Sequence, residues 1–408
     1  MEHLDILATA IGALVLALGL ASRKLERSPF PPTLLALVFG VLLGPQVSGF
    51  IDLTELGERS RILEGAARLT LAIGLVGVAL GIPREFVRRN WRDMAVLIGG
   101  SMPLMWCIST LLVFWLLALP FWLAALIAAI VTATDPIAST PIVTGALAEK
   151  DVPEGIRHAI LFESGANDGL AYVFVFLPFL LVTRPAGEAW SHWLTHTVLL
   201  EVGGATLLGV VLGFAAGKLL RFAEQRSLIG RDWRLVYTVA MALLAVGAGR
   251  LIGSDELLVV FAAGIAFVQV VSSSERCNEE AGQEAVNRFF SVPVFALVGI
   301  AIPWDGWMKL GWTGVLLALA LLLLRRIPAL LLLRPFLKAG HRTADALFMG
   351  WFGPIAVAAV YYAALMEDKL SEPLIWDITS LVVCASVVVH GLTGSPFTRW
   401  YGRHSPSR

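Results

Sequence analysis

Residues 125–140 read A-L-I-A-A-I-V-T-A-T-D-P-I-A-S-T. They lie within an apolar run over 121–147, and a helix needs about 20 such residues to cross a bilayer. The run is interrupted at 132–136 by threonines, an acid and a proline. Backbone that leaves the helix at membrane depth is tolerated only where protein or a water-filled cavity surrounds it. The stretch therefore predicts a broken membrane helix built around a site.

The composition also indicates a chain that lies mostly in a bilayer. Of the 408 residues, 57% are hydrophobic and only 15% are charged, whereas a soluble protein of this size has about a quarter of its residues charged. Lys plus Arg and Asp plus Glu are equal at 31 each, so no bulk charge favours a nucleic acid as partner. We predict an all-α polytopic membrane protein, a single transmembrane domain over residues 1–408, with the lipid bilayer as its surroundings.

Thirteen transmembrane helices are predicted, numbered here as spans in chain order. They cover 4–21, 32–50, 68–82, 94–118, 121–147, 157–182, 197–220, 234–251, 255–271, 288–302, 310–334, 343–366 and 374–396. Most Lys and Arg residues fall in alternate loops and in the C-terminal tail, and such residues concentrate on the cytoplasmic side. The N-terminus is therefore predicted outside and the C-terminus in the cytoplasm.

A second break supports an internal repeat. Span 12 contains G-W-F-G-P at 350–354, with Gly353 and Pro354 at its end, and it lies seven spans after the break that contains Pro136. With thirteen spans, segments seven apart run in opposite directions, so spans 1–6 and 8–13 are predicted to be inverted repeats. Paired breaks of this kind in two halves indicate a transporter site. The alternative is a simple proline kink in each helix.

Five charged residues fall inside apolar spans, where facing lipid would cost each about 2.5–3.5 kcal/mol. They are Asp135, Glu163, Asp168, Arg325 and Arg326. Glu163 and Arg326 lie about two turns from the cytoplasmic ends of spans 6 and 11, so we predict that they form a structural ion pair. Arg325 points about 100° away on a regular helix. It is expected either to snorkel towards the inner interface or to replace Arg326 in the pair.

Asp135 and Asp168 then have no predicted basic partner. Ser164 and Asp168 share one face of span 6, Glu163 and Asn167 share the next, and Thr134 is available from the break. These are hard oxygen ligands, which suit a small cation such as Na⁺ and do not suit zinc or iron. We predict that Asp168, Ser164 and Asp135 hold the ion. A proton and a cation would compete for Asp168, so exchange needs no ATP and no cofactor.

Three motifs in these spans resemble the monovalent cation:proton antiporters of the NhaP/NHE type. They are T-A-T-D-P-I-A-S-T at 132–140, F-E-S-G-A-N-D-G-L-A-Y at 162–172 and G-W-F-G-P-I-A-V-A-A-V at 350–360. The third is similar to the branch that includes fungal plasma-membrane Na⁺/H⁺ antiporters. The resemblance covers nearly the whole chain.

The resemblance implies an NhaA-like fold in which the broken spans 5 and 12 cross. Spans 4–6 and 11–13 would form a transport core that moves like an elevator. Spans 1–3 and 8–10 would form a part that makes a homodimer, with span 7 as linker. By the same resemblance Asp168 is the ion- and proton-binding carboxylate, helped by Thr134, Asp135 and Ser164. Asn167 stands where electrogenic relatives carry a second aspartate, which implies electroneutral exchange. The location implied is the plasma (inner) membrane.

Two departures from the family pattern stand out. Span 3 offers no acid between Leu69 and Ile82, and Ile355 occupies the place of a commoner arginine after Gly-Pro. Na⁺, Li⁺ and K⁺ all prefer oxygen ligands, so a K⁺/H⁺ antiporter of the same fold is the first alternative. An intramembrane aspartyl protease using Asp135 and Asp168 is a remote one, and a channel or a transporter of organic solutes is another.

Overall fold

The computed structural model describes residues 2–25, 28, 30–136, 140–230, 232–271 and 273–404. In these residues the regular structure is helical throughout and contains no strand. Eight helices are long and apolar enough to cross a membrane, and three shorter apolar ones accompany them, at Pro32–Leu43, Phe121–Ile130 and Glu256–Val270. The prediction of an all-α polytopic membrane protein is confirmed.

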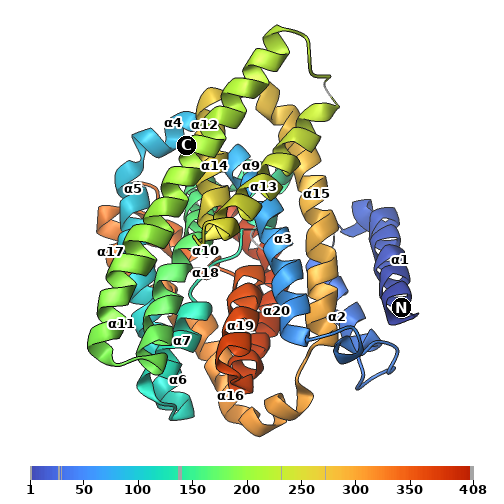
Figure 1. Ribbon diagram of the computed structural model, residues 1–408, viewed down its shortest axis with the longest axis vertical. Helices are drawn as coiled ribbons and strands as arrows, with labels where there is room; N and C mark the ends of the chain where they lie inside the picture. The colour runs from blue at the N-terminus through green and yellow to red at the C-terminus, as the bar shows by residue number, and fades with distance from the viewer. Residues whose placement is uncertain are drawn as a thin grey trace.

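Figure 1 shows how the helices are arranged. The first half contains α1 (Glu2–Leu25), α2 (Pro32–Leu43), η1 (Leu53–Glu55), α3 (Arg59–Leu80), α4 (Arg84–Arg89), α5 (Trp91–Val96), η2 (Leu97–Ser101), α6 (Met102–Leu117), α7 (Phe121–Ile130), α8 (Thr140–Val143), α9 (Gly145–Asp151) and α10 (Glu154–Thr183). The second half contains α11 (Ala186–His192), η3 (Trp193–Val202), α12 (Gly203–Gln225), α13 (Trp233–Leu251), α14 (Glu256–Val270), α15 (Ser273–Ile300), α16 (Trp304–Leu324), α17 (Ile327–Leu333), η4 (Arg334–Phe336), α18 (Thr343–Trp351), α19 (Val357–Leu370) and α20 (Pro373–His404).

Several helix ends differ from the predicted span ends. α2 stops at Leu43, seven residues before the end of the predicted span, because Gly44 turns to an extended conformation and Pro45 follows. α15 begins at Ser273, before the predicted apolar run from 288, because the stretch between is rich in Glu and Ala, which favour a helix. Apolar length therefore locates a span but misses the polar turns that extend its helix.

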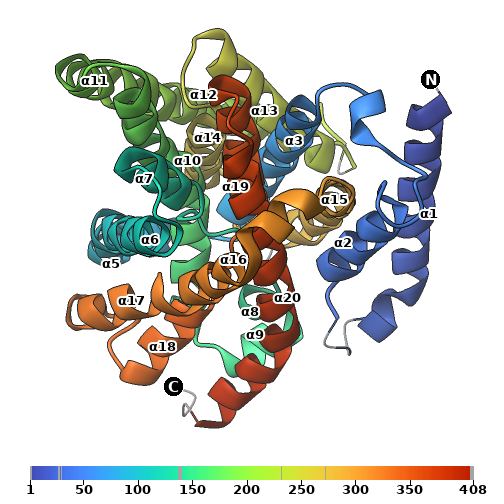
Figure 2. The same cartoon turned by 90° about the horizontal axis from the view of Figure 1, so that it is seen from below.

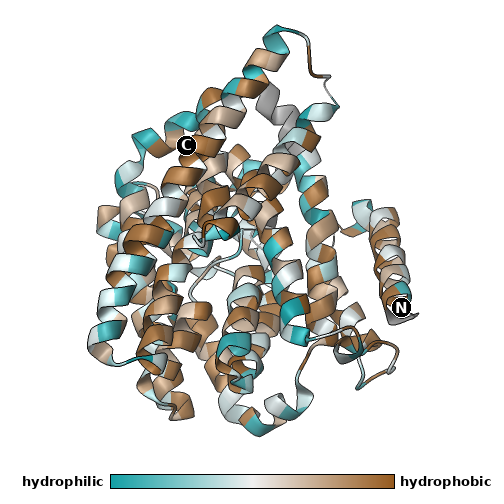
Figure 3. Cartoon of the chain, in the orientation of Figure 1, coloured by the Kyte–Doolittle hydropathy of each residue, from teal (hydrophilic) through white to brown (hydrophobic). Residues whose placement is uncertain are grey.

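Hydrophobic residues predominate along the helices of the bundle, and many hydrophilic ones lie near helix ends and in the loops (Figure 3). α1 lies at the edge of the bundle beside α2, with most of its length exposed (Figure 2). α10 lies in the interior, in contact with α3, α7, α14 and η3. The buried middle of α10 is therefore surrounded by protein and not by lipid.

Two glycines let α14 lie directly against α10. A Cβ at Gly165 would stand 2.5 Å from the Phe261 ring, and one at Gly169 would stand 2.9 Å from the Leu258 Cα. Such small residues allow two membrane helices to approach closely. Since Gly165 meets Phe261 and Gly169 meets Leu258, the helices run antiparallel, and the start of α14 lies beside the turn of α10 that follows Gly169.

Candidate ion-binding site

Two broken helices meet at the centre of the molecule. α7 ends at Ile130 and residues 131–136 are buried and non-helical, while the next three residues lie outside the described part of the chain. α18 ends at Trp351, and 352–356 are non-helical up to α19. The Asp135 N–H donates to the Pro354 carbonyl at 2.9 Å. The first interruption occurs at the predicted residues, whereas the second begins at Phe352, two residues later than predicted. The two breaks touch each other through their backbones.

Asp135 also holds the start of α19. Its Oδ2 accepts a hydrogen bond from the Val357 N–H at 2.6 Å. The first N–H groups of a helix lack partners within the helix and carry partial positive charge. A carboxylate is therefore well placed here, and this contact accounts for an acid in the break. The sequence predicts Asp135 as a ligand of the ion. In the structure its Oδ2 caps the N-terminal end of α19.

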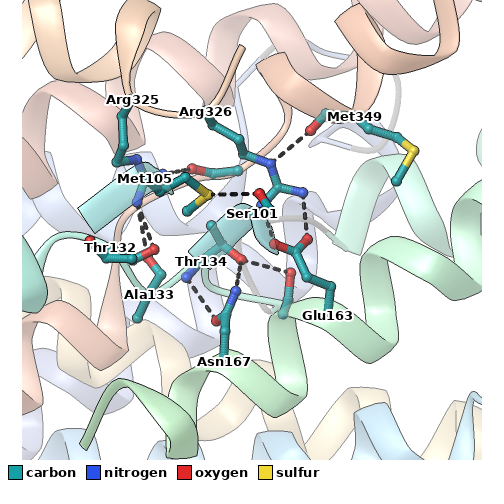
Figure 4. Close-up of polar contacts among 12 residues, drawn as sticks. Ser101, Met105, Thr132, Ala133, Thr134, Glu163, Asn167, Arg325, Arg326 and Met349 are labelled. Carbon is teal, nitrogen blue, oxygen red and sulfur yellow. Dashed lines mark hydrogen bonds and ion pairs between the residues drawn. The ribbon is translucent and has the colours of Figure 1, made fainter. Parts of the chain in front are cut away.

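Arg325 lies beside the C-terminal ends of α7 and α18, the helices that lead into the two breaks. Its side chain is buried, and Nη1 donates to the Thr132 carbonyl at 3.0 Å and contacts the carbonyl of Val131. Nη2 donates to the Gly353 carbonyl at 2.5 Å. One guanidinium group thus donates hydrogen bonds to backbone carbonyls that follow both α7 and α18 (Figure 4). The expectation that Arg325 snorkels to the interface or pairs with Glu163 is wrong.

We expect Arg325→Gln to destabilise the protein by about 2–3 kcal/mol, because several buried carbonyls would lose their donor together. The measurement is the thermal unfolding midpoint in detergent, followed by tryptophan fluorescence. Arg342→Gln is the matched control because Arg342 is exposed. An Arg325→Gln protein that unfolds at the same temperature as this control would contradict the assigned role.

Glu163 and Arg326 form a buried ion pair. Nη1 and Nη2 of Arg326 donate to Oε1 and Oε2 of Glu163 at 3.0 and 2.5 Å, which is the two-pronged geometry that favours arginine over lysine. Arg326 Nε donates to the Met349 carbonyl at 2.9 Å. A Cβ at Gly353 would stand 2.4 Å from Arg326 Cδ, so the second break needs glycine here. The ion pair that was predicted from the similar depth of the two residues in the membrane is therefore present.

Three polar side chains tie the first break to α10 (Figure 4). The Thr134 N–H donates to Asn167 Oδ1 at 3.0 Å, and Asn167 Nδ2 donates to the Thr134 hydroxyl at 2.7 Å. The hydroxyls of Thr134 and Ser164 lie 3.1 Å apart. The structure thus brings together three of the residues predicted to cluster, namely Thr134, Ser164 and Asn167. Asn167 holds the non-helical backbone of the first break through its hydrogen bond from the Thr134 N–H.

Asp168 is the one member of the predicted set whose carboxylate stands apart. The residue is 0% exposed, and neither Oδ1 nor Oδ2 has a hydrogen-bond partner among the described residues. Its backbone carbonyl accepts a hydrogen bond from the Tyr362 hydroxyl at 2.8 Å. An isolated buried carboxylate is very costly while it stays charged. A proton on this carboxylate, or a cation beside it, would remove that cost.

The sequence reading missed the residues that support the second break from α20. Ser386 Oγ accepts from the Ile355 N–H at 2.7 Å, and His390 Nε2 lies 3.0 Å from the Trp351 carbonyl. The two side chains also contact each other, 3.1 Å from Oγ to Nδ1. Polar residues four apart in an apolar span were the available signal. His390 thus contacts the backbone at the end of α18.

The chain matches a known family over almost its whole length. The profile described as "Sodium/hydrogen exchanger, transmembrane" matches residues 10–400. A probable Na⁺/H⁺ antiporter of Schizosaccharomyces pombe is 32% identical over 88% of this chain and 51% of that protein. The K⁺/H⁺ antiporter NhaP2 of Shewanella oneidensis is 22% identical over 93% of this chain and 64% of that protein. The chain thus spans about half the length of the fungal relative it matches.

The fold is that of a solved antiporter. The sodium proton antiporter MjNhaP1 from Methanocaldococcus jannaschii at pH 8 superposes with a TM-score of 0.76 over 98% of this chain and 99% of that one, at 17% identity. An identity this low carries information on the fold and none on the transported ion. The two chains therefore share their overall helical fold.

Proposed function

The chain belongs to the sodium/hydrogen exchanger family, and from this premise we propose that it exchanges Na⁺ for H⁺ across the membrane. The observation that supports this function best is the buried carboxylate of Asp168, which has no partner in the described residues and lies beside two broken helices. A group in that position is neutralised by one small cation at a time. Because a bound metal displaces the proton, binding of one ion releases the other.

We propose the residues of the site as follows. Asp168 binds the ion or the proton. Ser164, Thr134 and Asp135 are the neighbouring oxygen donors to Na⁺, and Asn167 positions Thr134 through its two hydrogen bonds. Water or backbone completes the shell. Glu163 and Arg326 are structural, and Pro136, Gly353 and Pro354 keep the breaks open.

Electroneutral exchange is the proposed stoichiometry. The other buried charges around the breaks, Asp135 and Glu163 against Arg325 and Arg326, balance formally. Among the described charged residues around the breaks, Asp168 is then the one without an opposite charge, and either ion alone neutralises it. We expect the exchange rate to be the same with the membrane potential clamped at zero or at 100 mV. Moving one net charge through that potential is worth about 2.3 kcal/mol, so a strong dependence on potential would contradict one-for-one exchange.

The larger architecture is proposed on the same family basis. The thirteen spans form inverted repeats with an NhaA-like arrangement. Spans 4–6 and 11–13 are the moving core of an elevator, and spans 1–3 and 8–10 are the part that forms a homodimer. The N-terminus lies outside, the C-terminus lies in the cytoplasm, and the location is the plasma (inner) membrane.

The function is tested in proteoliposomes that enclose a pH dye. A sodium gradient should move protons in the opposite direction, and the assay repeated with Li⁺ and K⁺ orders the ions. Faster proton movement with K⁺ than with Na⁺ would favour the alternative function, K⁺/H⁺ antiport. The Shewanella relative is named as an antiporter of that kind. No proton movement with any alkali cation would end the proposal. A protease with an Asp135–Asp168 dyad has little support, because the Asp168 carboxylate makes no hydrogen bond to Asp135.

A further inference from the structure

Helix α19 lies along the boundary between the two parts of the fold that we propose to move against each other. It belongs to the proposed transport core and packs on α3, which belongs to the proposed dimer-forming part (Figure 1). The Val357 N–H at its start donates to Asp135 of the first break. The Tyr362 hydroxyl donates to the backbone carbonyl of Asp168 at 2.8 Å. α19 is thus bound to the proposed exchange site, so its contacts with the other part bear on how the site moves.

An ion pair joins the end of α19 to the start of α3. Arg59 Nη2 contacts Glu367 Oε1, and the two side chains are 27% and 12% exposed. The Arg59 guanidinium also lies 5.4 Å from the centroid of the Trp376 ring, which is buried and donates from Nε1 to the Ala301 carbonyl at 3.0 Å. Water screens a pair in such surroundings less than it screens an exposed pair. The ion pair therefore favours the arrangement of α3 and α19 seen here.

A buried hydrogen bond joins α19 to α14, which also belongs to the proposed dimer-forming part. Asp255 caps the start of α14, and the next residue, Glu256, accepts from the Tyr361 hydroxyl at 2.8 Å. Tyr361 and Glu256 are only 3% and 8% exposed. At 1.5 Å per residue, Glu367 lies about 9 Å beyond Tyr361 along α19, towards the side on which α10 ends and which we propose to face outward. The two contacts therefore follow the boundary from the level of Asp168 outward.

The boundary is of another kind where α10 meets α14. There Gly165 and Gly169 lie against Phe261 and Leu258, so the surfaces in contact are small or apolar. Apolar contact has no preferred direction, and helices that meet in this way can slide without losing a specific partner. A hydrogen bond or an ion pair is lost when its atoms move a few ångströms apart. The polar contacts of α19 therefore depend more strictly on one arrangement of the two parts.

We propose that the Arg59–Glu367 ion pair and the Tyr361–Glu256 hydrogen bond form a latch that keeps the protein closed on the outward side of Asp168. Both contacts break when the core slides and form again when it returns. The role of the latch rests on the proposed exchange by an elevator movement, whereas its effect on the arrangement of α3 and α19 does not. The latch sets how often the site opens outward, and it leaves the intrinsic affinity of Asp168 for the ion unchanged.

A purely structural role makes a different prediction. Two latch variants test it: Glu367→Gln removes the charge of the acid at constant size, and Tyr361→Phe removes one hydroxyl group. If the contacts only stabilise the fold, both variants lower the unfolding temperature and leave the arrangement of α3 and α19 as it was. If they form a latch, both variants increase the fraction of molecules in which α3 and α19 are apart. Glu188→Gln is the matched control, because the Arg184–Glu188 pair is predicted on the same side and does not cross the boundary.

The first measurement needs no transport. Spin labels are attached to cysteines introduced at two exposed positions, Glu58 before α3 and Lys369 near the end of α19, and their dipolar coupling reports the distance across the boundary. Alanine first replaces the native cysteines, which are Cys107, Cys277 and Cys384. We expect one short distance in this protein and in its Glu188→Gln form, and a second, longer distance in each latch variant. A distance distribution that the latch variants leave unchanged would overturn the latch.

This measurement separates the latch from the proposed function. If the latch variants lengthen the distance but the protein exchanges no alkali cation for protons, the proposed function fails and the latch stands. If the protein exchanges cations and the distance does not respond to either variant, the latch fails and the proposed function stands.

The second measurement uses proteoliposomes with the protein in one orientation. An apparent dissociation constant equals the intrinsic one divided by the fraction of molecules in the binding-competent arrangement. For Na⁺ added on the outward side, we therefore expect both latch variants to lower KM by about threefold or more, and for Na⁺ added on the opposite side to raise it slightly. The charge-swapped protein Arg59→Glu/Glu367→Arg should return KM towards the wild-type value. A KM that changes equally from both sides, or from neither, would contradict the proposal.

Discussion

Asp168→Asn is expected to reduce cation-driven proton movement to the rate of protein-free liposomes. The Asn side chain has the shape of the Asp side chain but can neither release a proton nor balance a bound cation. Neither of the two carboxylates near the breaks replaces it, because Glu163 is paired with Arg326 and Asp135 Oδ2 accepts from the Val357 N–H. The measurement is the dye assay described above, with Asp305→Asn, a change of an exposed aspartate, as control.

Loss of exchange must be separated from loss of folding. We expect Asp168→Asn to be at least as stable as the wild type, because an unpartnered buried carboxylate destabilises the fold that contains it. Sodium should raise the unfolding temperature of the wild type, since a ligand at 100 times its Kd adds about 2.7 kcal/mol. The Asn variant should show little of this rise. An Asp168→Asn protein that folds, exchanges at the wild-type rate and is stabilised equally by sodium would contradict the mechanism.

Competition at one carboxylate also sets how pH acts on the cation. Lowering the pH fills Asp168 with protons, so the apparent KM for Na⁺ should rise as the pH falls. A KM that stays constant over the working pH range would indicate that the two ions use separate groups. Together with the exchange assay, this dependence distinguishes an exchanger from a channel, in which protons and sodium need not exclude each other.

The breaks and the main ion pair were predictable because they depend on local chemistry. A proline or glycine beside an acid inside an apolar run is costly in a bilayer, so Asp135-Pro136 and Gly353-Pro354 mark backbone that protein must surround. Glu163 and Arg326 could be matched from depth alone, because rise per residue is constant along a helix. These inferences need no knowledge of which helices are neighbours.

Arg325 could not be placed in the same way. α16 ends at Leu324 and α17 begins at Ile327, so the two arginines lie at a junction between helices. The regular 100° step from one residue to the next does not hold there, and both side chains turn inward. Asp255 and Glu256 were missed for another reason. Acids at the start of an apolar run usually lie at the membrane interface, and only the close packing of α14 on α10 buries them here.

Breaking the Glu163–Arg326 pair should have the largest effect on stability. Removing one partner of a buried ion pair leaves the other charge without compensation and typically costs about 3–5 kcal/mol. We therefore expect Glu163→Gln or Arg326→Met alone to lower the unfolding temperature sharply. The double variant leaves no isolated charge, so it should be milder than the sum of the two single variants by about 2–3 kcal/mol. The measurement is a double-mutant cycle on unfolding in detergent.

An exposed pair provides the matched control for this cycle. Arg184 and Glu188 lie one turn apart with their side chains 38% and 61% exposed, and their closest N and O atoms are 3.3 Å apart. Water screens such a pair, so its removal should cost no more than about 1 kcal/mol and show little coupling. The comparison isolates burial as the cause, since both pairs join an arginine to a glutamate. If the two cycles gave the same small coupling, Glu163 and Arg326 would not depend on each other for stability.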